Sequence, residues 1–215
     1  MSNPASGSVQ VGSLATEFSV ALLGQLIGRG LRDIVLCPGA RSQALALAAA
    51  AWEQQGRVRL RVRIDERVAG FLALGIAVET GRPVAVITTS GTAVANLHPA
   101  VLEAHHSGIP LILLTADRPV ELRGIGSNQT TDQVGMFGSA VSWVRDVAPP
   151  VDSVGAASLA EEAYAAAVGT IDAMPMPTKD ERDKIIDTVF GSTNPIIVGT
   201  LREGLRDDEV FKNII

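Results

Sequence analysis

The sequence predicts an α/β protein with a doubly wound, mostly parallel sheet that carries helices on both faces. Short apolar runs alternate along the chain with segments in which apolar residues recur at helical spacing. This alternation is typical of parallel strands joined by right-handed helical crossovers. The expected strands are also apolar throughout rather than at alternate positions, which favours a sheet covered on both faces.

The first half of the chain shows the alternation clearly. A helix is expected over residues 13–30, because apolar residues recur at helical spacing and a glycine ends the pattern. DIVLC is a short buried strand that Pro-Gly stops. The next elements are a helix over SQALALAAAAWEQQG (42–56), a strand over RLRVRI (59–64) and a helix over ERVAGFLALGIAVETG (66–81).

The second half continues the series. PVAVITTSG (83–91) is a strand that enters a turn, and TAVANLHPAVLEAHHSG (92–108) is expected to form one helix with a proline inside it. PLILLTADRP (110–119) is the most apolar strand. A short helix near DQVGMFGSA, a further strand over SWVRDV (142–147) and an alanine-rich helix over LAEEAYAAAVGTIDA (159–173) complete the pattern.

Composition narrows the function classes. The chain has 215 residues, of which 47% are hydrophobic, enough for a sizeable core. A net charge of -5 argues against nucleic acid as a partner. The single cysteine, Cys37, allows no internal disulfide and fits a reducing compartment. No apolar run reaches the roughly 18 residues of a membrane span, and the N-terminal residues lack a signal-peptide layout. We therefore expect a cytoplasmic protein without a membrane span.

Composition also changes near residue 172. Residues 1–170 contain no lysine, whereas Lys179, Lys184 and Lys212 lie in the last part of the chain, where alanine becomes rare. Residues 1–172 are therefore predicted to form one domain. Residues 173–215 are predicted to be either a C-terminal extension packed on that domain or the start of a second domain.

Ligands of such sheets bind at the carboxyl ends of the strands. The unusual residues of this sequence follow the expected strands, in four loops that can converge on one edge. These loops are Pro38–Ser42, Asp65–Glu66, Ser90–Thr92 and Asp117–Gln129.

The paired acids allow two interpretations. An acid in the first turn of a helix is favoured by the helix dipole, and Asp65 can provide the N-cap. One acid suffices for capping, so Glu66 is left either as a second favourable charge or as a functional carboxylate.

Two turns could bind a ligand through backbone N–H groups at a helix start. In CPGARS, Arg41 can add a guanidinium for an anion, although a simple turn with a solvated arginine explains the same residues. In TTSGTAVAN, Gly91 lets the backbone approach a ligand closely. Neither turn is a Walker A loop or a GxGxxG fingerprint. A generic nucleotide-binding protein is therefore disfavoured.

The loop ADRPVELRGIGSNQTTDQ (116–133) is the longest polar stretch, and long loops of this kind are usually functional or mobile. Arg118 stands at its start and suits bidentate binding of a carboxylate. His105 and His106 end a helix and have no cysteine or third histidine nearby, so no metal site is predicted.

Together these stretches resemble a known family. LCPGARS, RIDERVAGFLALGIA and TTSGTAVANLHPAVLEAHHSGIPLILLTADRPVELRGIGSNQTTDQVGMFGSAV are similar, in order and spacing, to the N-terminal part of MenD-type 2-succinyl-5-enolpyruvyl-6-hydroxy-3-cyclohexene-1-carboxylate synthases. The resemblance covers about residues 12–148, and residues 173–215 are expected to be unlike the family. It implies the pyrimidine-binding domain of a thiamine-diphosphate enzyme.

The resemblance also implies residue roles. Glu66 matches the family's catalytic glutamate, which hydrogen-bonds the cofactor's aminopyrimidine. Arg41, Arg118 and Gln129 match substrate-binding residues. The segment beside the aminopyrimidine is matched by Ser90, Gly91, Thr92 and Asn96.

The implied reaction decarboxylates 2-oxoglutarate on thiamine diphosphate and adds the succinyl carbanion to isochorismate, in menaquinone biosynthesis. The family's metal, Mg²⁺ or Mn²⁺, binds a GDG…N segment of a pyrophosphate domain that this sequence does not contain. The family's site lies between two subunits. The resemblance therefore implies a homodimer or tetramer, or a complementing pyrophosphate-domain chain, and we expect the chain alone to be inactive.

One departure supports an alternative. The family usually reads PGSRS, and Ala40 here removes a hydroxyl able to bind substrate. The alternative function is a non-catalytic remnant or interaction module with the same fold.

Overall fold

The structure, a computed structural model, describes residues 13–173. In this part of the chain four parallel strands form one sheet in the order β2-β1-β3-β4. The strands are β1 (Asp33–Leu36), β2 (Arg59–Val62), β3 (Val84–Thr88) and β4 (Leu111–Thr115). The predicted α/β class with a parallel sheet is confirmed.

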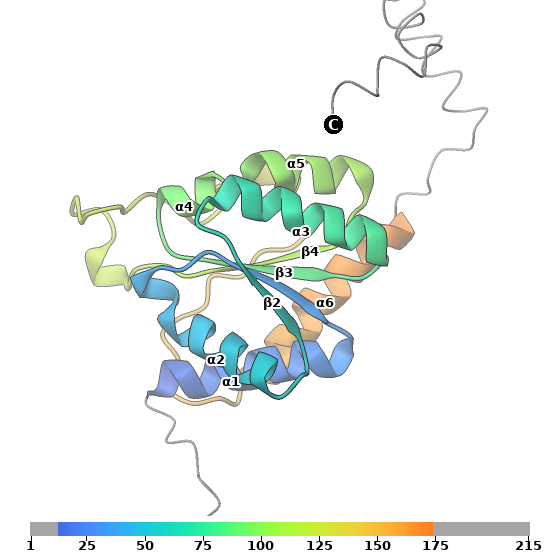
Figure 1. The fold of residues 1–215 in the computed structure, drawn as a ribbon. Helices are drawn as coiled ribbons and strands as arrows, with labels where there is room; N and C mark the ends of the chain where they lie inside the picture. Colours follow the sequence, from blue (N-terminus) through green and yellow to red (C-terminus); the bar gives the residue numbers. More distant parts are fainter. Residues whose placement is uncertain (1–12, 174–215) are drawn as a thin grey trace, which may run out of the picture. The chain divides into compact units, whose positions relative to one another are not determined.

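Helices cover both faces of this sheet, as predicted (Figure 1). On one face lie α1 (Leu14–Arg29), α2 (Gln43–Gln54) and α6 (Ala156–Ala173). On the other lie α3 (Glu66–Thr80), α4 (Thr92–Ala95) and α5 (His98–Ser107). Each face has its own buried cluster, the first around Leu23 and Leu26 and the second around Ala73 and Leu97. The three apolar side chains of β1 are divided between the two clusters, with Ile34 and Leu36 in the first and Val35 in the second.

The expected single helix over residues 92–108 is two helices, so that prediction was wrong. The helix stops at Ala95 and resumes at His98. The reason is Pro99, which has no N–H to donate to a carbonyl of the preceding turn. The restart places Pro99 in the first turn of α5, where no such donor is needed.

The expected strand over residues 142–147 is not a strand. Side chains rather than ladder hydrogen bonds hold this segment. Arg145 Nη2 lies 2.6 Å from Glu162 Oε2 of α6, and Arg123 Nη1 lies 3.0 Å from Asp146 Oδ2. The short helix expected near residues 132–140 is a 3₁₀ turn, Gly138–Ala140.

Strand β2 also differs from the expectation of strands covered on both faces, because it lies at the edge of the sheet and is half-exposed. The two arginines of β2 bind a buried carboxylate of the neighbouring strand β1. Arg59 and Arg61 place three nitrogens 2.6–2.9 Å from the carboxylate of Asp33, which is 2% exposed. Burial alone would raise the pKa of Asp33, but hydrogen bonds and charge from the two arginines outweigh it and lower the pKa.

The order of the strands creates a switch point between β1 and β3. From β1 the chain continues through α2 on one face of the sheet, and from β3 it continues through α4 on the other face. At such a point the two connections diverge, and ligands of open α/β sheets bind in the crevice expected there, at the carboxyl edge. The predicted extension or second domain over residues 173–215 lies outside the described residues, apart from residue 173 itself.

Candidate functional site

The four predicted loops do meet at one edge of the sheet, because all four strands run parallel. The loops after β1 and β3 are in direct contact. A Cβ added to Gly39 would lie 2.7 Å from Thr89 Oγ1 and 2.8 Å from Thr89 Cγ2, closer than real Cβ atoms come. Glycine is therefore required at position 39 by the approach of the neighbouring loop, and the two loops are packed against each other.

Glu66 is the first residue of α3, and Asp65 is its N-cap. The Asp65 carboxylate accepts a hydrogen bond from the Val68 N–H at 2.9 Å, as predicted. Glu66 is half-buried and forms no hydrogen bond or ion pair with another residue of the range 13–173. Since Asp65 already caps the helix, the structure gives Glu66 no capping role.

The charges of these two acids act on the thiol of Cys37. Cys37 directly follows β1 and is 1% exposed. Its pKa is raised to about 11, first by burial and then by the negative charges of Glu66 and Asp65. Glu66 follows β2, which pairs in parallel with β1, so it stands at the carboxyl edge of the sheet next to the end of β1.

Arg41 lies in the 3₁₀ turn Ala40–Ser42 that leads into α2. Ser42 is buried and its Oγ donates to the Gly39 carbonyl at 3.1 Å, which closes the turn. Arg41 is exposed and has no hydrogen bond or ion pair to any other residue that the structure describes. Its guanidinium is thus available to an anion.

The turn after β3 is built around Gly91, whose backbone angles are φ 82° and ψ -136°. Its N–H donates to Gln133 Oε1 at 2.9 Å, and its carbonyl accepts from the Val94 N–H at 3.0 Å. Ser90 is buried, whereas Thr92 is exposed. The exposed Asn96 donates through Nδ2 to the carbonyl of Thr92 at 3.2 Å, within the same turn.

The long loop after β4 is braced from within. The Arg118 guanidinium donates through Nη2 to the Asn128 carbonyl, and its buried Nε has no partner among the described residues. Arg123 donates to the Arg118 carbonyl at 3.1 Å and pairs with Asp117 at 2.9 Å. Gln129 is exposed and has a left-handed backbone, with φ 60°.

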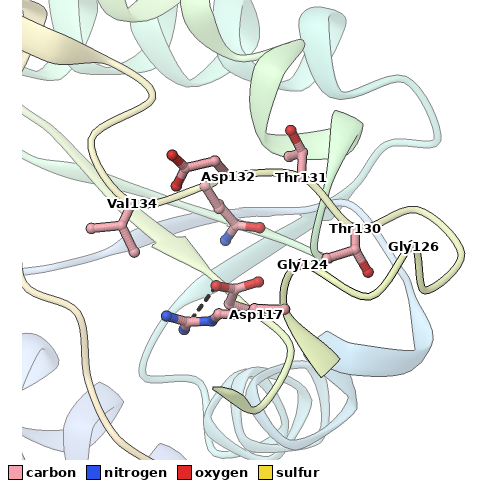
Figure 2. A pocket seen from close by; sticks show the side chains of 9 residues that line it. Asp117, Gly124, Gly126, Thr130, Thr131, Asp132 and Val134 are labelled. Atoms are coloured by element: carbon pink, nitrogen blue, oxygen red, sulfur yellow. Dashed lines mark ion pairs between the residues drawn. The ribbon is translucent and has the colours of Figure 1, made fainter. Parts of the chain in front are cut away.

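A hollow of about 550 Å³ lies inside this loop (Figure 2). Asp117, with its ion pair to Arg123, lies across the hollow from Asp132. Neither Glu66, Arg41, Arg118 nor Gln129 lines the hollow. It is a feature of the loop interior, and Gln133 is among the residues that line it.

Some of the predicted site residues contact one another in the structure, and others do not. Gly91 packs against Gln129, and Arg118 holds the residue before Gln129. Within the described range, Arg41 and Glu66 form no hydrogen bond to this group. Gln133, which accepts a hydrogen bond from the Gly91 N–H, was not among the predicted site residues. The two residues are 42 positions apart, and no spacing signal links them.

A doubly wound sheet, a carboxylate at a helix start and a glycine turn beside a switch point define a class of cofactor-binding domain. The family model described as thiamine pyrophosphate enzyme, N-terminal TPP binding domain, matches residues 16–136, and the chain belongs to this family.

Curated relatives make the match more specific. The chain is 61% identical over 178 residues to the 2-succinyl-5-enolpyruvyl-6-hydroxy-3-cyclohexene-1-carboxylate synthase of Leifsonia xyli subsp. xyli, covering 81% of this chain and 30% of the relative. It is 51% identical over 208 residues to the synthase of the same name from Clavibacter michiganensis subsp. michiganensis, covering 95% of this chain and 34% of the relative. The resemblance seen in the motifs is confirmed.

The chain thus spans about a third of the length of these relatives. The match to the Clavibacter synthase extends beyond residue 172, since it covers 95% of the chain. The domain boundary near that residue stays a prediction. No helix among residues 13–173 is long and apolar enough to cross a membrane. In the same range no three His, Cys, Asp or Glu side chains are grouped so that they could hold a metal ion.

Proposed function

We propose that this chain is the pyrimidine-binding part of a synthase that decarboxylates 2-oxoglutarate on thiamine diphosphate and transfers the succinyl unit to isochorismate. The observation that carries the proposal is the position of Glu66. It stands beside the end of β1 at the ligand edge, and Asp65 already performs the capping that would otherwise explain it.

The residues at the crevice fit the pyrimidine end of thiamine diphosphate. An aminopyrimidine nitrogen needs a carboxyl group that can share a proton, and Glu66 has no competing partner among the described residues. A flat ring also needs close backbone approach, which the Gly91 turn provides. When bound, the cofactor supplies the carbon nucleophile of the reaction.

In this proposal Glu66 holds a proton at the ring nitrogen N1′. Half-burial strengthens that hydrogen bond relative to one in water. Ser90, Gly91, Thr92 and Asn96 line the side of the ring. The backbone of this turn is already fixed by its bonds to Gln133 and Val94, so little ordering is needed on binding.

Substrate recognition is assigned to Arg41, Arg118 and Gln129. Both substrates are carboxylates, which guanidinium groups bind in bidentate fashion. Arg41 is unpaired within the described range, and the Nε of Arg118 lacks a partner there. These two donors are supplied by loops on opposite sides of β3, because β1 and β4 flank that strand.

The remaining parts are proposed to come from elsewhere in such a synthase. A diphosphate-bound Mg²⁺ or Mn²⁺ would be held by a pyrophosphate domain, in a homodimer, a tetramer or a complex with a complementing chain. We also propose a cytoplasmic location, for which the buried, unpaired Cys37 is the support.

The test is isochorismate-dependent consumption of 2-oxoglutarate by the 215-residue chain, with and without the segment of the Clavibacter synthase that follows its matched region. We expect turnover only in the complemented mixture, and titration calorimetry of the chain alone should show no micromolar binding of thiamine diphosphate with Mg²⁺. A complemented mixture that assembles but consumes no 2-oxoglutarate would favour a non-catalytic module.

A further inference from the structure

The side-chain amide of Gln133 uses both of its ends on the main chain. Its Oε1 accepts from the Gly91 N–H at 2.9 Å, and its Nε2 donates to the Ala116 carbonyl at 2.9 Å. Gly91 belongs to the turn after β3, and Ala116 opens the loop after β4. One half-buried side chain thus joins the two neighbouring loops at the ligand edge.

This bridge continues the β3–β4 ladder beyond its last residues. The Ala116 N–H donates to the Thr88 carbonyl at 3.0 Å, which is the final main-chain bond between the two strands. Past this point the chains diverge, and the Gln133 amide spans the gap. The buried N–H of Gly91 has no other hydrogen bond in the described part of the chain, so its loss would leave a donor unsatisfied.

The same region holds Gln129. Its carbonyl carbon would lie 2.9 Å from a Cβ on Gly91, so the two main chains are packed together. Arg118 fixes the other side of this short segment through the Asn128 carbonyl. The positions of Gln129 and of the Gly91 turn therefore depend on one another, and Gln133 is the side chain that bonds directly to the turn.

We propose that Gln133 is a positioning residue that sets the separation between the cofactor-side turn at Gly91 and the substrate-side loop of Arg118 and Gln129. It touches neither ligand and acts through the main chain at both ends. The assignment of the Gly91 turn to the cofactor and of the Arg118 and Gln129 loop to the substrate rests on the proposed function. The bridge formed by Gln133 can be tested in the ligand-free chain.

The first experiment is amide hydrogen exchange by NMR on the 215-residue chain. Gln133→Met keeps the size of the side chain and removes both hydrogen bonds. Gln133→Glu keeps the acceptor for Gly91 but loses the donor to Ala116. We expect Gly91 protection to fall about tenfold in Gln133→Met and to stay within about twofold of the unmodified chain in Gln133→Glu. Gln54→Met, at an exposed position of α2, is the control and should change nothing.

The amide of Ile87, a fully buried residue of β3, separates a local positioning effect from general destabilisation through its protection against exchange. It should be unchanged in both variants. Unchanged Gly91 protection in Gln133→Met, or an equal loss at Gly91 and Ile87, would overturn the proposal.

The second experiment measures the complemented mixture. Because the bridge joins both loops, Gln133→Met should raise the half-saturating concentrations of thiamine diphosphate and of 2-oxoglutarate together, each by about fivefold or more, with a smaller change in kcat. A change in kcat alone would contradict this role. An inactive mixture would count against the proposed function and leave the exchange experiment to decide on the bridge.

Discussion

Gly91 and Gln129 pack main chain against main chain at the ligand edge of the sheet. A Cβ at position 91 would overlap the carbonyl oxygen of Gln129, and the backbone angles there, φ 82° and ψ -136°, are open only to glycine. Gln129 itself has the left-handed φ of 60°, which is uncommon for a residue with a side chain. The two loops that carry the proposed cofactor and substrate contacts are thus fitted to each other.

Gly91→Ala should therefore destabilise the chain by about 1–3 kcal/mol, because both the backbone angles and the contact are violated. Gly75→Ala is the matched control, since it lies within α3, is exposed and has open space around it. It should stabilise by roughly 0.5–1 kcal/mol through helix propensity. Urea denaturation measures both changes, and equal effects would contradict the argument.

The buried Asp33 should make stability depend on acid pH. Its pKa is lowered in the folded chain, so its contribution is present above the ordinary aspartate pKa and is lost as pH falls through the folded value. Asp33→Asn should cost about 1–3 kcal/mol at pH 7, because charged hydrogen bonds to Arg59 and Arg61 are lost. The difference from the unmodified chain should shrink below about pH 4. Glu103→Gln, at an exposed site, should show no such pH-dependent gap.

Substitutions of Asp65 and Glu66 should have different effects, the first on stability and the second on catalysis. Asp65→Ala removes the N-cap of α3 and should cost about 1 kcal/mol in thermal or chemical unfolding. Glu66→Gln should leave stability within about 0.5 kcal/mol. In the complemented mixture, however, it should reduce turnover about 100-fold or more, since the proton at the ring nitrogen can no longer be shared. A normal rate in Glu66→Gln would remove this residue from the mechanism.

Cys37 should be inert at neutral pH and should weaken the fold at alkaline pH. With a pKa of about 11, the folded thiol stays protonated where a thiol of the ordinary value, 9.0, would ionise. The unfolded state therefore loses its proton first, and stability falls as pH rises from 9 toward 11. Cys37→Ala should lack this alkaline loss when both chains are unfolded in urea at pH 8 and pH 10.5. Rapid labelling of Cys37 by iodoacetamide at pH 7.5 would speak against the raised pKa.

Arg118→Ala tests substrate recognition. The half-saturating concentration of 2-oxoglutarate should rise about tenfold, because a charged hydrogen bond to a carboxylate is lost, while that of thiamine diphosphate should change little. Steady-state kinetics of the complemented mixture give both values. Equal losses for the two ligands would mean that Arg118 acts mainly as a brace through the Asn128 carbonyl.

The predictions from sequence were wrong where tertiary contacts determine the local structure. The segment 142–147 was predicted to be a strand, but it does not join the sheet. Its charged side chains form ion pairs instead, Arg145 with Glu162 and Asp146 with Arg123. Strand β2 was expected to be covered, but its position at the sheet edge leaves it half-exposed. Neither fact can be read from local periodicity, because strand order and ion pairing depend on distant segments.

The sequence by itself determined the parallel sheet, the N-cap of α3 at Asp65 and the family, because these follow from local patterns of apolar residues, turn residues and motifs. It also identified the edge at which Glu66, Arg41 and Arg118 stand, since the loops that follow parallel strands share one side. Only the tertiary structure decided that Gly91 meets Gln129 and that Gln133 bridges two loops. Such contacts join residues tens of positions apart, and they depend on how closely folded main chains approach one another.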